Sequence, residues 1–208
     1  MIFSLRQLQE KCREQRQPLY IAFVDLTKAF DLVSRSGLYK LLQKIGCPPK
    51  LLQLIVAFHE DTKGAVQYDG LLSDHFPIRN GVKQGCVLAP TLFGTFFSLL
   101  LSFAFRQSED GIYLHTRTDG GLFNLARLRS KTKVRRVFIR EFLFADDAAL
   151  VAHSEEGSQR QIDCFAGACK EFGLTVSLDM AKILSQEVNR IPNIKIGDHL
   201  LAVFEEFT

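Results

Sequence analysis

The chain has 208 residues with 26 Lys+Arg against 23 Asp+Glu, so its net charge is +3, and its 47% hydrophobic and 24% charged residues exclude a disordered or fibrous protein. Five cysteines and five histidines are present without a CxxC, HxxxH or HExxH pattern. This spacing disfavours a zinc site or a secreted disulfide scaffold, and predicts a reducing intracellular setting, either the cytoplasm or the nucleus.

The first fifth of the chain predicts a helix, a strand and a second helix. Apolar residues at helical spacing indicate a short surface helix over residues 2–16. The run LYIAFV at residues 19–24 is typical of a strand buried on both faces, and it ends at Asp25. A helix is then expected from Ser34 to the Gly and Pro residues at 46–49, because these residues end helices.

The middle of the chain contains another helix, two turn signals and a long uncharged segment. Leu and Ile residues predict a helix that begins at Leu51. The Asp-Gly pair at residues 69–70 predicts a hairpin, and the Asn-Gly pair at 80–81 a second turn. Residues 84–105 carry no charge, but their Gly, Pro, Ser and Thr content favours a buried helix over 91–105 rather than a membrane span.

The last part of the chain predicts a strand, a hairpin and a helix. Residues 122–140 alternate as a strand does, residues 142–152 are apolar around two acids, and residues 158–172 are amphipathic and end at Gly173. Strands and helices mix without a regular βαβ order, and there is no repeat or linker. We therefore expect one α+β domain over residues 1–208.

A row of basic residues lies on one face of the strand expected at residues 122–140. Its members, two residues apart, are Arg127, Arg129, Lys131 and Lys133. This row fits either a solvated strand face or a contact to nucleic-acid phosphates, and the sequence leaves both readings open.

Three carboxylates stand out at the ends of apolar strands. Asp25 follows a buried strand, which by itself is common to several fold classes. The pair Asp146 and Asp147 lies between two apolar segments, so a hairpin with two acids at its tip is expected, and Asp tolerates the left-handed backbone of such turns. The alternative is a plain surface turn.

The chemistry of these acids favours a metal site. Two like charges held together inside an apolar hairpin are unfavourable unless a cation compensates them. Carboxylates without His or Cys specify a hard ion, Mg²⁺ or Mn²⁺. Two such ions can support nucleotidyl transfer by activating a hydroxyl and stabilising a leaving pyrophosphate.

Three motifs in order resemble those of reverse transcriptases, in the form found in non-LTR (LINE-type) retrotransposons. They read FVDLTKAFD at residues 23–31, NGVKQGCVLAP at 80–90 and FADD at 144–147. The resemblance extends over nearly the whole chain. It implies a polymerase palm with an antiparallel sheet, packed helices and part of the fingers, and an RNA-directed DNA polymerase that joins dNTPs to a primer 3′-hydroxyl.

The resemblance also implies roles for the matching residues. Asp25, Asp146 and Asp147 would hold two Mg²⁺ or Mn²⁺ ions, and Leu26 would offer its backbone carbonyl to a metal. Phe30 would block a 2′-hydroxyl, although it also fits an ordinary core aromatic. Two residues of the second motif, Gln84 and Gly85, would lie over the incoming nucleotide and the template. Gly85 is also consistent with a glycine that only forms a turn before the helix.

The implied partners are an RNA template, a DNA primer or target, and dNTPs, without a membrane. We expect the basic fingers strands, the thumb and any endonuclease to lie outside this chain. The chain also departs from the family in one place. The family's Lys-Thr pair aligns with Met180 and Ala181, and Lys182 is displaced by two residues.

Two rival functions follow. The first is a catalytically inactive retrotransposon remnant that still binds nucleic acid, which the Met180 departure favours. The second is a phosphoacceptor receiver-like domain, which also clusters three acids and a lysine. The order of its acids is opposite to the order here, which disfavours it.

Overall fold

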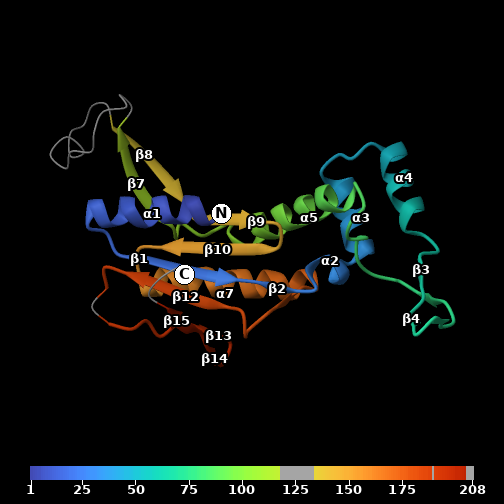
Figure 1. Cartoon of the computed structure of the whole chain (residues 1–208). Helices are drawn as coiled ribbons and strands as arrows, with labels where there is room; N and C mark the ends of the chain where they lie inside the picture. The colour runs from blue at the N-terminus through green and yellow to red at the C-terminus, as the bar shows by residue number, and fades with distance from the viewer. Residues whose placement is uncertain (118–133, 189, 205–208) are drawn as a thin grey trace. The chain divides into compact units, whose positions relative to one another are not determined.

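The apolar run at residues 19–24 forms an inner strand of a five-stranded sheet in the computed structural model of the chain (Figure 1). The structure describes residues 1–117, 134–188 and 190–204. The chain divides into two compact units. Unit 1 consists of Met1–Leu26, Phe105–Gly167 and Val176–Thr208, and unit 2 consists of Thr27–Ala104 and Ala168–Thr175.

The sheet of unit 1 is mostly antiparallel, in agreement with the expectation drawn from the resemblance. Its strands, in spatial order, are β15 (Ala202–Phe204), β12 (Lys182–Gln186), β1 (Leu19–Val24), β10 (Asp147–Ala152) and β9 (Glu141–Phe144). β1 pairs antiparallel with both β10 and β12, and β15 runs parallel to β12. Since β1 has a partner on each side, its backbone hydrogen bonds are satisfied inside the core.

Helix α1 (Ile2–Gln15) covers one face of this sheet (Figure 1). Side chains of one parity on the strands meet one stripe of the helix, as the two-residue period of a strand requires. The buried cluster contains Leu5, Leu8, Cys12, Leu19, Ile21, Ile112, Leu114, Ala149, Val151 and Leu184. The predicted helix over residues 2–16 and the predicted strand over 19–24 are both confirmed.

Strand residues of the other parity are buried as well, so the second face of the sheet is also covered. Helix α7 (Glu155–Phe172) is tied to β10 because the buried Gln161 amide donates to the carbonyl of Val151 over 3.2 Å. The same amide donates to the carbonyl of Asp110 over 3.0 Å. Apolar α7 side chains such as Ile162 are almost completely buried.

A long hairpin and a short one complete unit 1. β7 (Ile112–Arg117) pairs antiparallel with β8 (Val134–Ile139), and β13 (Lys195–Ile196) pairs with β14 (His199–Leu200). β8 confirms the C-terminal part of the strand expected at residues 122–140. The part from 122 to 133 lies outside the described residues.

Unit 2 consists of helices and two short ribbons. The helices are α2 (Ala29–Leu32), α3 (Arg35–Lys44), α4 (Pro49–His59) and α5 (Ala89–Ala104). The ribbons pair β3 (Lys63–Gly64) with β6 (Phe76–Pro77) and β4 (Gln67–Tyr68) with β5 (Leu71–Leu72). The short strands β2 (Leu26–Thr27) and β11 (Thr175–Val176) span the boundaries between the units.

Local signals explain these elements. The Ser34 hydroxyl caps α3 by accepting a hydrogen bond from the Gly37 N–H over 3.2 Å. Asp69 and Gly70 both have positive φ, 46° and 77°, as a two-residue hairpin turn of the predicted kind requires.

The uncharged segment forms α5, and Pro90 lies in its first turn. None of the described helices is long and apolar enough to cross a membrane.

Candidate active site

The strand register brings Asp25 and Asp147 together. β1 and β10 are paired up to Val24 and Ala148, so continuing this antiparallel register by one residue places Asp25 beside Asp147. Both acids have the same parity as the strand residues packed on α1, so both side chains lie on that face of the sheet. The two carboxylates, 122 positions apart in the sequence, are therefore neighbours at one end of the sheet.

Asp146 lies in the turn that joins β9 to β10. Phe144 pairs with Asp147, which leaves a two-residue turn of Ala145 and Asp146. The expected hairpin is confirmed, but the residue with the left-handed backbone is Ala145, with φ of 55°, and not an aspartate. Because an alanine there costs free energy, the fold holds this strained turn in place.

The three carboxylates influence one another electrostatically. Burial is the largest cause that raises the pKa of Asp147 above its ordinary value, and the negative charges of Asp25 and Asp146 raise it further. All three side chains are half-buried. The cluster is therefore a site where negative charge is crowded, and where a cation would lower the free energy.

This crowding predicts how stability depends on pH. Between the ordinary and the raised pKa of Asp147, the folded chain binds more protons than the unfolded chain, so the free energy of unfolding falls as pH rises through this range. The Asp147→Asn variant should therefore be more stable than the wild type at pH 7, and this gain should shrink as the pH falls below about 4. Urea denaturation at both pH values measures it. A variant less stable than the wild type at pH 7 would contradict this electrostatic argument.

The donor set of the cluster fits a hard metal ion in its chemistry. Within residues 1–117, 134–188 and 190–204, no group of three or more His, Cys, Asp or Glu side chains is already arranged to hold a metal ion. The carboxylates are nevertheless close enough for Asp25 and Asp146 to shift the pKa of Asp147. Oxygen ligands of this kind suit Mg²⁺ or Mn²⁺.

Backbone contacts fix the chain immediately after β1. The carbonyl of Asp25 accepts a hydrogen bond from the Ser177 N–H over 2.9 Å. The Leu26 side chain is 2% exposed and belongs to the core, so only its backbone carbonyl could serve a ligand. That role for Leu26 stays a prediction.

Strand β12 places a lysine on the same face as the carboxylates. Lys182 pairs with Phe23, which shares its parity with Asp25, so Lys182 is a diagonal neighbour of Asp25 across the strand pair. Lys182 is exposed, whereas Ala181 is buried and Met180 is 61% exposed. Register thus orients Lys182 toward the acidic face despite its two-residue displacement from the family position.

Phe30, in unit 2, packs against the long apolar helix. Its ring stacks on Phe93 of α5 with centroids 4.3 Å apart and an interplanar angle of 23°. The side chain is half-buried, so one face is held in the core. This contact agrees with Phe30 being an ordinary core aromatic. The role of Phe30 at the nucleotide sugar stays a prediction.

The second motif is fastened to the Phe30 segment by backbone hydrogen bonds within unit 2. The Gly81 N–H donates to the carbonyl of Val33 over 2.8 Å, and the Val82 N–H donates to the carbonyl of Phe30 over 2.9 Å. Gly85 follows with φ of 88° and no heavy atom within 4 Å of where a Cβ would be. Glycine at 85 is thus explained by backbone conformation, not by lack of space.

Gln84 and Gly85 are exposed, in agreement with a surface that could contact a ligand. The basic row Arg127, Arg129, Lys131 and Lys133 lies outside the described residues. The next basic residues belong to β8, where the Arg136 guanidinium lies 3.7 Å from the centre of the Tyr113 ring. Arg136 therefore has a structural partner within its own hairpin.

Comparison with known proteins decides the family. The family model described as reverse transcriptase (RNA-dependent DNA polymerase) matches residues 2–191. The chain belongs to the reverse transcriptase family. Its relatives are retrotransposon proteins, which confirms the resemblance to the non-LTR type drawn from the three motifs.

The chain is 26% identical over 175 residues to a Pol polyprotein of the type-1 retrotransposable element R2 from Bradysia coprophila, covering 84% of the chain and 18% of that protein. It is 29% identical over 160 residues to the R2DM polyprotein of Drosophila melanogaster, covering 77% and 13%. Against the RNA-directed DNA polymerase of the mobile element jockey from the same fly, identity is 40% over 77 residues, which are 37% of the chain and 8% of that protein. The reverse transcriptase chain thus spans less than a fifth of the length of these relatives.

Solved structures support the fold. Apo telomerase from Candida tropicalis superimposes with a TM-score of 0.57 at 16% identity, over 90% of this chain and 34% of that one. Telomerase from the same organism in complex with a telomeric RNA fragment gives 0.58 at 14% identity, over 94% and 30%. The predicted α+β fold of a reverse transcriptase palm with part of the fingers is confirmed.

Sequence reasoning missed Arg35 of this reverse transcriptase. Its guanidinium donates to three backbone carbonyls, those of His59 over 2.7 Å, Ile78 over 2.9 Å and Gly81 over 2.9 Å. Arg35 therefore holds the segment that leads into Gln84. No local pattern marks this role, because the acceptors are main-chain atoms 24 to 46 residues away.

Proposed function

We propose that this chain carries the catalytic carboxylates of an RNA-directed DNA polymerase, which joins dNTPs to a primer 3′-hydroxyl on an RNA template. The observation that supports this proposal is the placement of Asp25 beside Asp147 by the β1–β10 register, with Asp146 in the adjoining turn. Carboxylates from two sequence motifs share one end of the sheet, where burial and then the charges of Asp25 and Asp146 raise the pKa of Asp147.

In this proposal Asp25, Asp146 and Asp147 hold two Mg²⁺ or Mn²⁺ ions, with the Leu26 carbonyl as a further oxygen ligand. When bound, such ions lower the pKa of an attacking hydroxyl and offset the charge of a leaving pyrophosphate. The strained turn at Ala145 keeps Asp146 next to Asp147, and the Ser177 hydrogen bond fixes the backbone at Asp25.

The residues of unit 2 are proposed to contact the substrates. Phe30 is assigned to the sugar of the incoming nucleotide, with its stack on Phe93 limiting the movement of the ring. Gln84 and Gly85 are assigned to the nucleotide and the template strand. Arg35 would act as a positioning residue, because it holds the backbone that precedes Gln84.

Metal binding tests the shared carboxylate site. We expect Mn²⁺ binding, followed by titration calorimetry, to weaken by at least about tenfold in Asp25→Asn and in Asp146→Asn, because each substitution removes a charged ligand. Cys164→Ser, which changes an exposed thiol on α7, serves as the control and should leave binding unchanged. Equal Mn²⁺ binding in all three variants would refute a shared metal site.

The second candidate function is a catalytically inactive remnant that binds nucleic acid. Met180, at the position of the family lysine, is the observation that favours it. Primer extension on an RNA template separates the two functions, because a remnant binds the template without extending the primer.

A further inference from the structure

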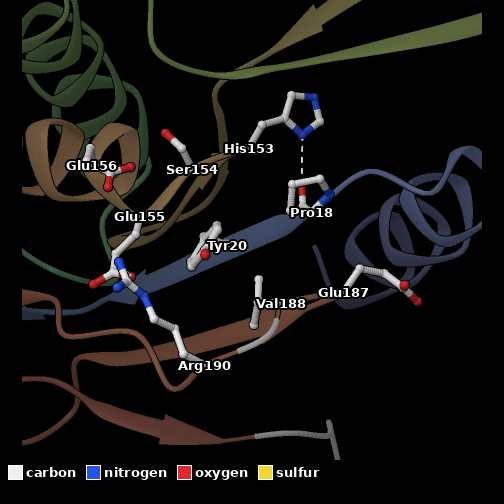
Figure 2. A pocket seen from close by; sticks show the side chains of 9 residues that line it. All are labelled: Pro18, Tyr20, His153, Ser154, Glu155, Glu156, Glu187, Val188 and Arg190. Carbon is white, nitrogen blue, oxygen red and sulfur yellow. Dashed lines mark hydrogen bonds and ion pairs between the residues drawn. The ribbon is translucent and has the colours of Figure 1, made fainter.

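A polar hollow of about 430 Å³ lies at the opposite end of β1 from the carboxylates, within unit 1 (Figure 2). Its walls come from the start of β1, from the connection between β10 and α7 with the first residues of α7, and from the residues after β12. Tyr20, in this wall, is five residues before Asp25 along the strand, which corresponds to about 17 Å. Being five apart, the two side chains also lie on opposite faces of the sheet. The hollow is therefore separate from the candidate active site.

One polar atom of this hollow is buried without a hydrogen-bond partner in the described part of the chain, Glu155 Oε2. The Tyr20 side chain, which is 8% exposed, lines the hollow beside it. The other carboxylate oxygen, Glu155 Oε1, accepts from the Asn193 N–H over 2.9 Å. Since buried polar groups are normally satisfied, Glu155 Oε2 points to a ligand that supplies a donor.

The charge of the lining selects a cation. Three carboxylates, Glu155, Glu156 and Glu187, line the hollow against one guanidinium, that of Arg190. His153 adds no charge, because its Nε2 accepts from the Tyr113 N–H over 3.1 Å and its Nδ1–H donates to the carbonyl of Pro18 over 2.8 Å. The net charge of about −2 excludes a phosphate or another anion as the ligand.

The chain itself shows which kind of cation fits. The Arg190 side chain is 75% exposed, yet one of its guanidinium nitrogens, Nη2, lies 3.3 Å from Glu155 Oε2 (Figure 2). Because the arginine half of this ion pair lies mostly in solvent and the contact is long, an incoming group can replace Arg190. The Tyr20 ring beside the carboxylate offers an apolar wall for a flat cation, which an arginine side chain presents and a hydrated metal ion does not.

We propose that this hollow binds the guanidinium of an arginine side chain from a basic segment of a partner protein, with Glu155 as its ion-pair partner and Tyr20 as its wall. Arg190 is displaced toward solvent when the partner arginine enters. The proposal does not depend on polymerase activity, because none of its residues belongs to the carboxylate cluster.

Titration of the 208-residue chain with the peptide acetyl-Gly-Arg-Gly-amide, followed by ¹H–¹⁵N correlation spectra, tests this inference. The same peptide with citrulline in place of arginine keeps the shape but removes the charge. We expect shifts at Tyr20 and Glu155 with the arginine peptide, and affinity at least about tenfold lower for the citrulline peptide, because charge-assisted hydrogen bonds are the strong ones.

Two substitutions should change the affinity in opposite directions. Glu155→Gln keeps an acceptor for the Asn193 N–H but loses the charge, so it should weaken arginine-peptide binding by about tenfold or more. Arg190→Ala removes the competing guanidinium and should tighten binding. Glu171→Gln, an exposed acid at the other end of α7, is the matched control and should change nothing.

Any of three results would overturn the proposal. They are no shifts in the hollow with the arginine peptide, equal binding of the citrulline peptide, or displacement of the peptide by millimolar Mg²⁺, which would make the hollow a metal site. If Glu155→Gln does not fold, Arg190→Ala still tests the proposal. Unchanged or weaker binding of the arginine peptide by that variant would contradict the displacement of Arg190.

Discussion

Primer extension by a longer polymerase that contains this chain should fall by about 10³-fold when Asp147 is replaced by Asn. In the proposed mechanism Asp147 helps to hold metal-bound charge, which would be worth several kcal/mol in the transition state, and each 1.36 kcal/mol corresponds to a tenfold change in rate. Extension of oligo(dT) on poly(rA) with Mg²⁺ or Mn²⁺ measures this loss.

The same substitution should make the folded chain more stable at pH 7, since it removes a partly buried charge beside Asp25 and Asp146. Loss of extension together with a gain in stability distinguishes a catalytic carboxylate from a structural one, whose removal would lower both.

Asp179→Asn is the matched control, because it removes one exposed carboxylate from the turn before β12 and should leave extension intact. Extension that survives in Asp147→Asn would favour a different carboxylate site, and absence of extension in the wild type would favour the inactive remnant.

Elements with strong local signals could be predicted from the sequence. The bounds of β1, Leu19–Val24, can be read from the sequence because six apolar residues end at a charged one. The hairpin at Asp69 and Gly70 followed from a turn pair that permits positive φ at both positions. α5 followed from an uncharged run too rich in small polar residues for a lipid environment.

Elements defined by distant partners could not be predicted in this way. β12, with the sequence KILSQ, has only two apolar residues, and it is a strand because it pairs with β1, more than 150 residues earlier in the chain. The left-handed residue of the β9–β10 turn is Ala145, although an Asp or Gly is the usual choice for that backbone.

The carboxylate site combines residues that a local motif predicts with an arrangement that depends on distant strand pairing. The motif supplied Asp25, Asp146 and Asp147 as candidates, but their shared face follows from the register of β1 and β10, which a single sequence does not specify. Likewise, Lys182 is displaced by two residues in the alignment, yet the two-residue period of a strand returns it to the same face.

Replacing Gly81 by Ala should lower the free energy of unfolding of unit 2 by on the order of 3–5 kcal/mol. A Cβ at residue 81 would lie 2.8 Å from the Cα and the carbonyl oxygen of Asp31, and 2.9 Å from the carbonyl oxygen of Phe30. These atoms belong to the backbone, so they cannot rotate away as a side chain can. The φ of 83° adds a conformational cost for any residue other than glycine.

Gly94→Ala is the matched control for this prediction. Residue 94 lies within α5, no heavy atom is within 4 Å of where its Cβ would be, and its φ is not positive. The same added methyl group should there raise the free energy of unfolding by about 0.5–1 kcal/mol, because alanine favours a helix more than glycine does.

Urea denaturation of both variants measures the contrast, and amide hydrogen exchange at Val82 reports whether the hydrogen bond to the Phe30 carbonyl is lost. Because that bond and the Arg35 contact to the Gly81 carbonyl hold the second motif to the Phe30 segment and to α3 within unit 2, Gly81→Ala should speed exchange there even if the rest of the chain stays folded. Unchanged stability and unchanged exchange at Val82 would show that the close approach at Gly81 does not hold the second motif to the Phe30 segment.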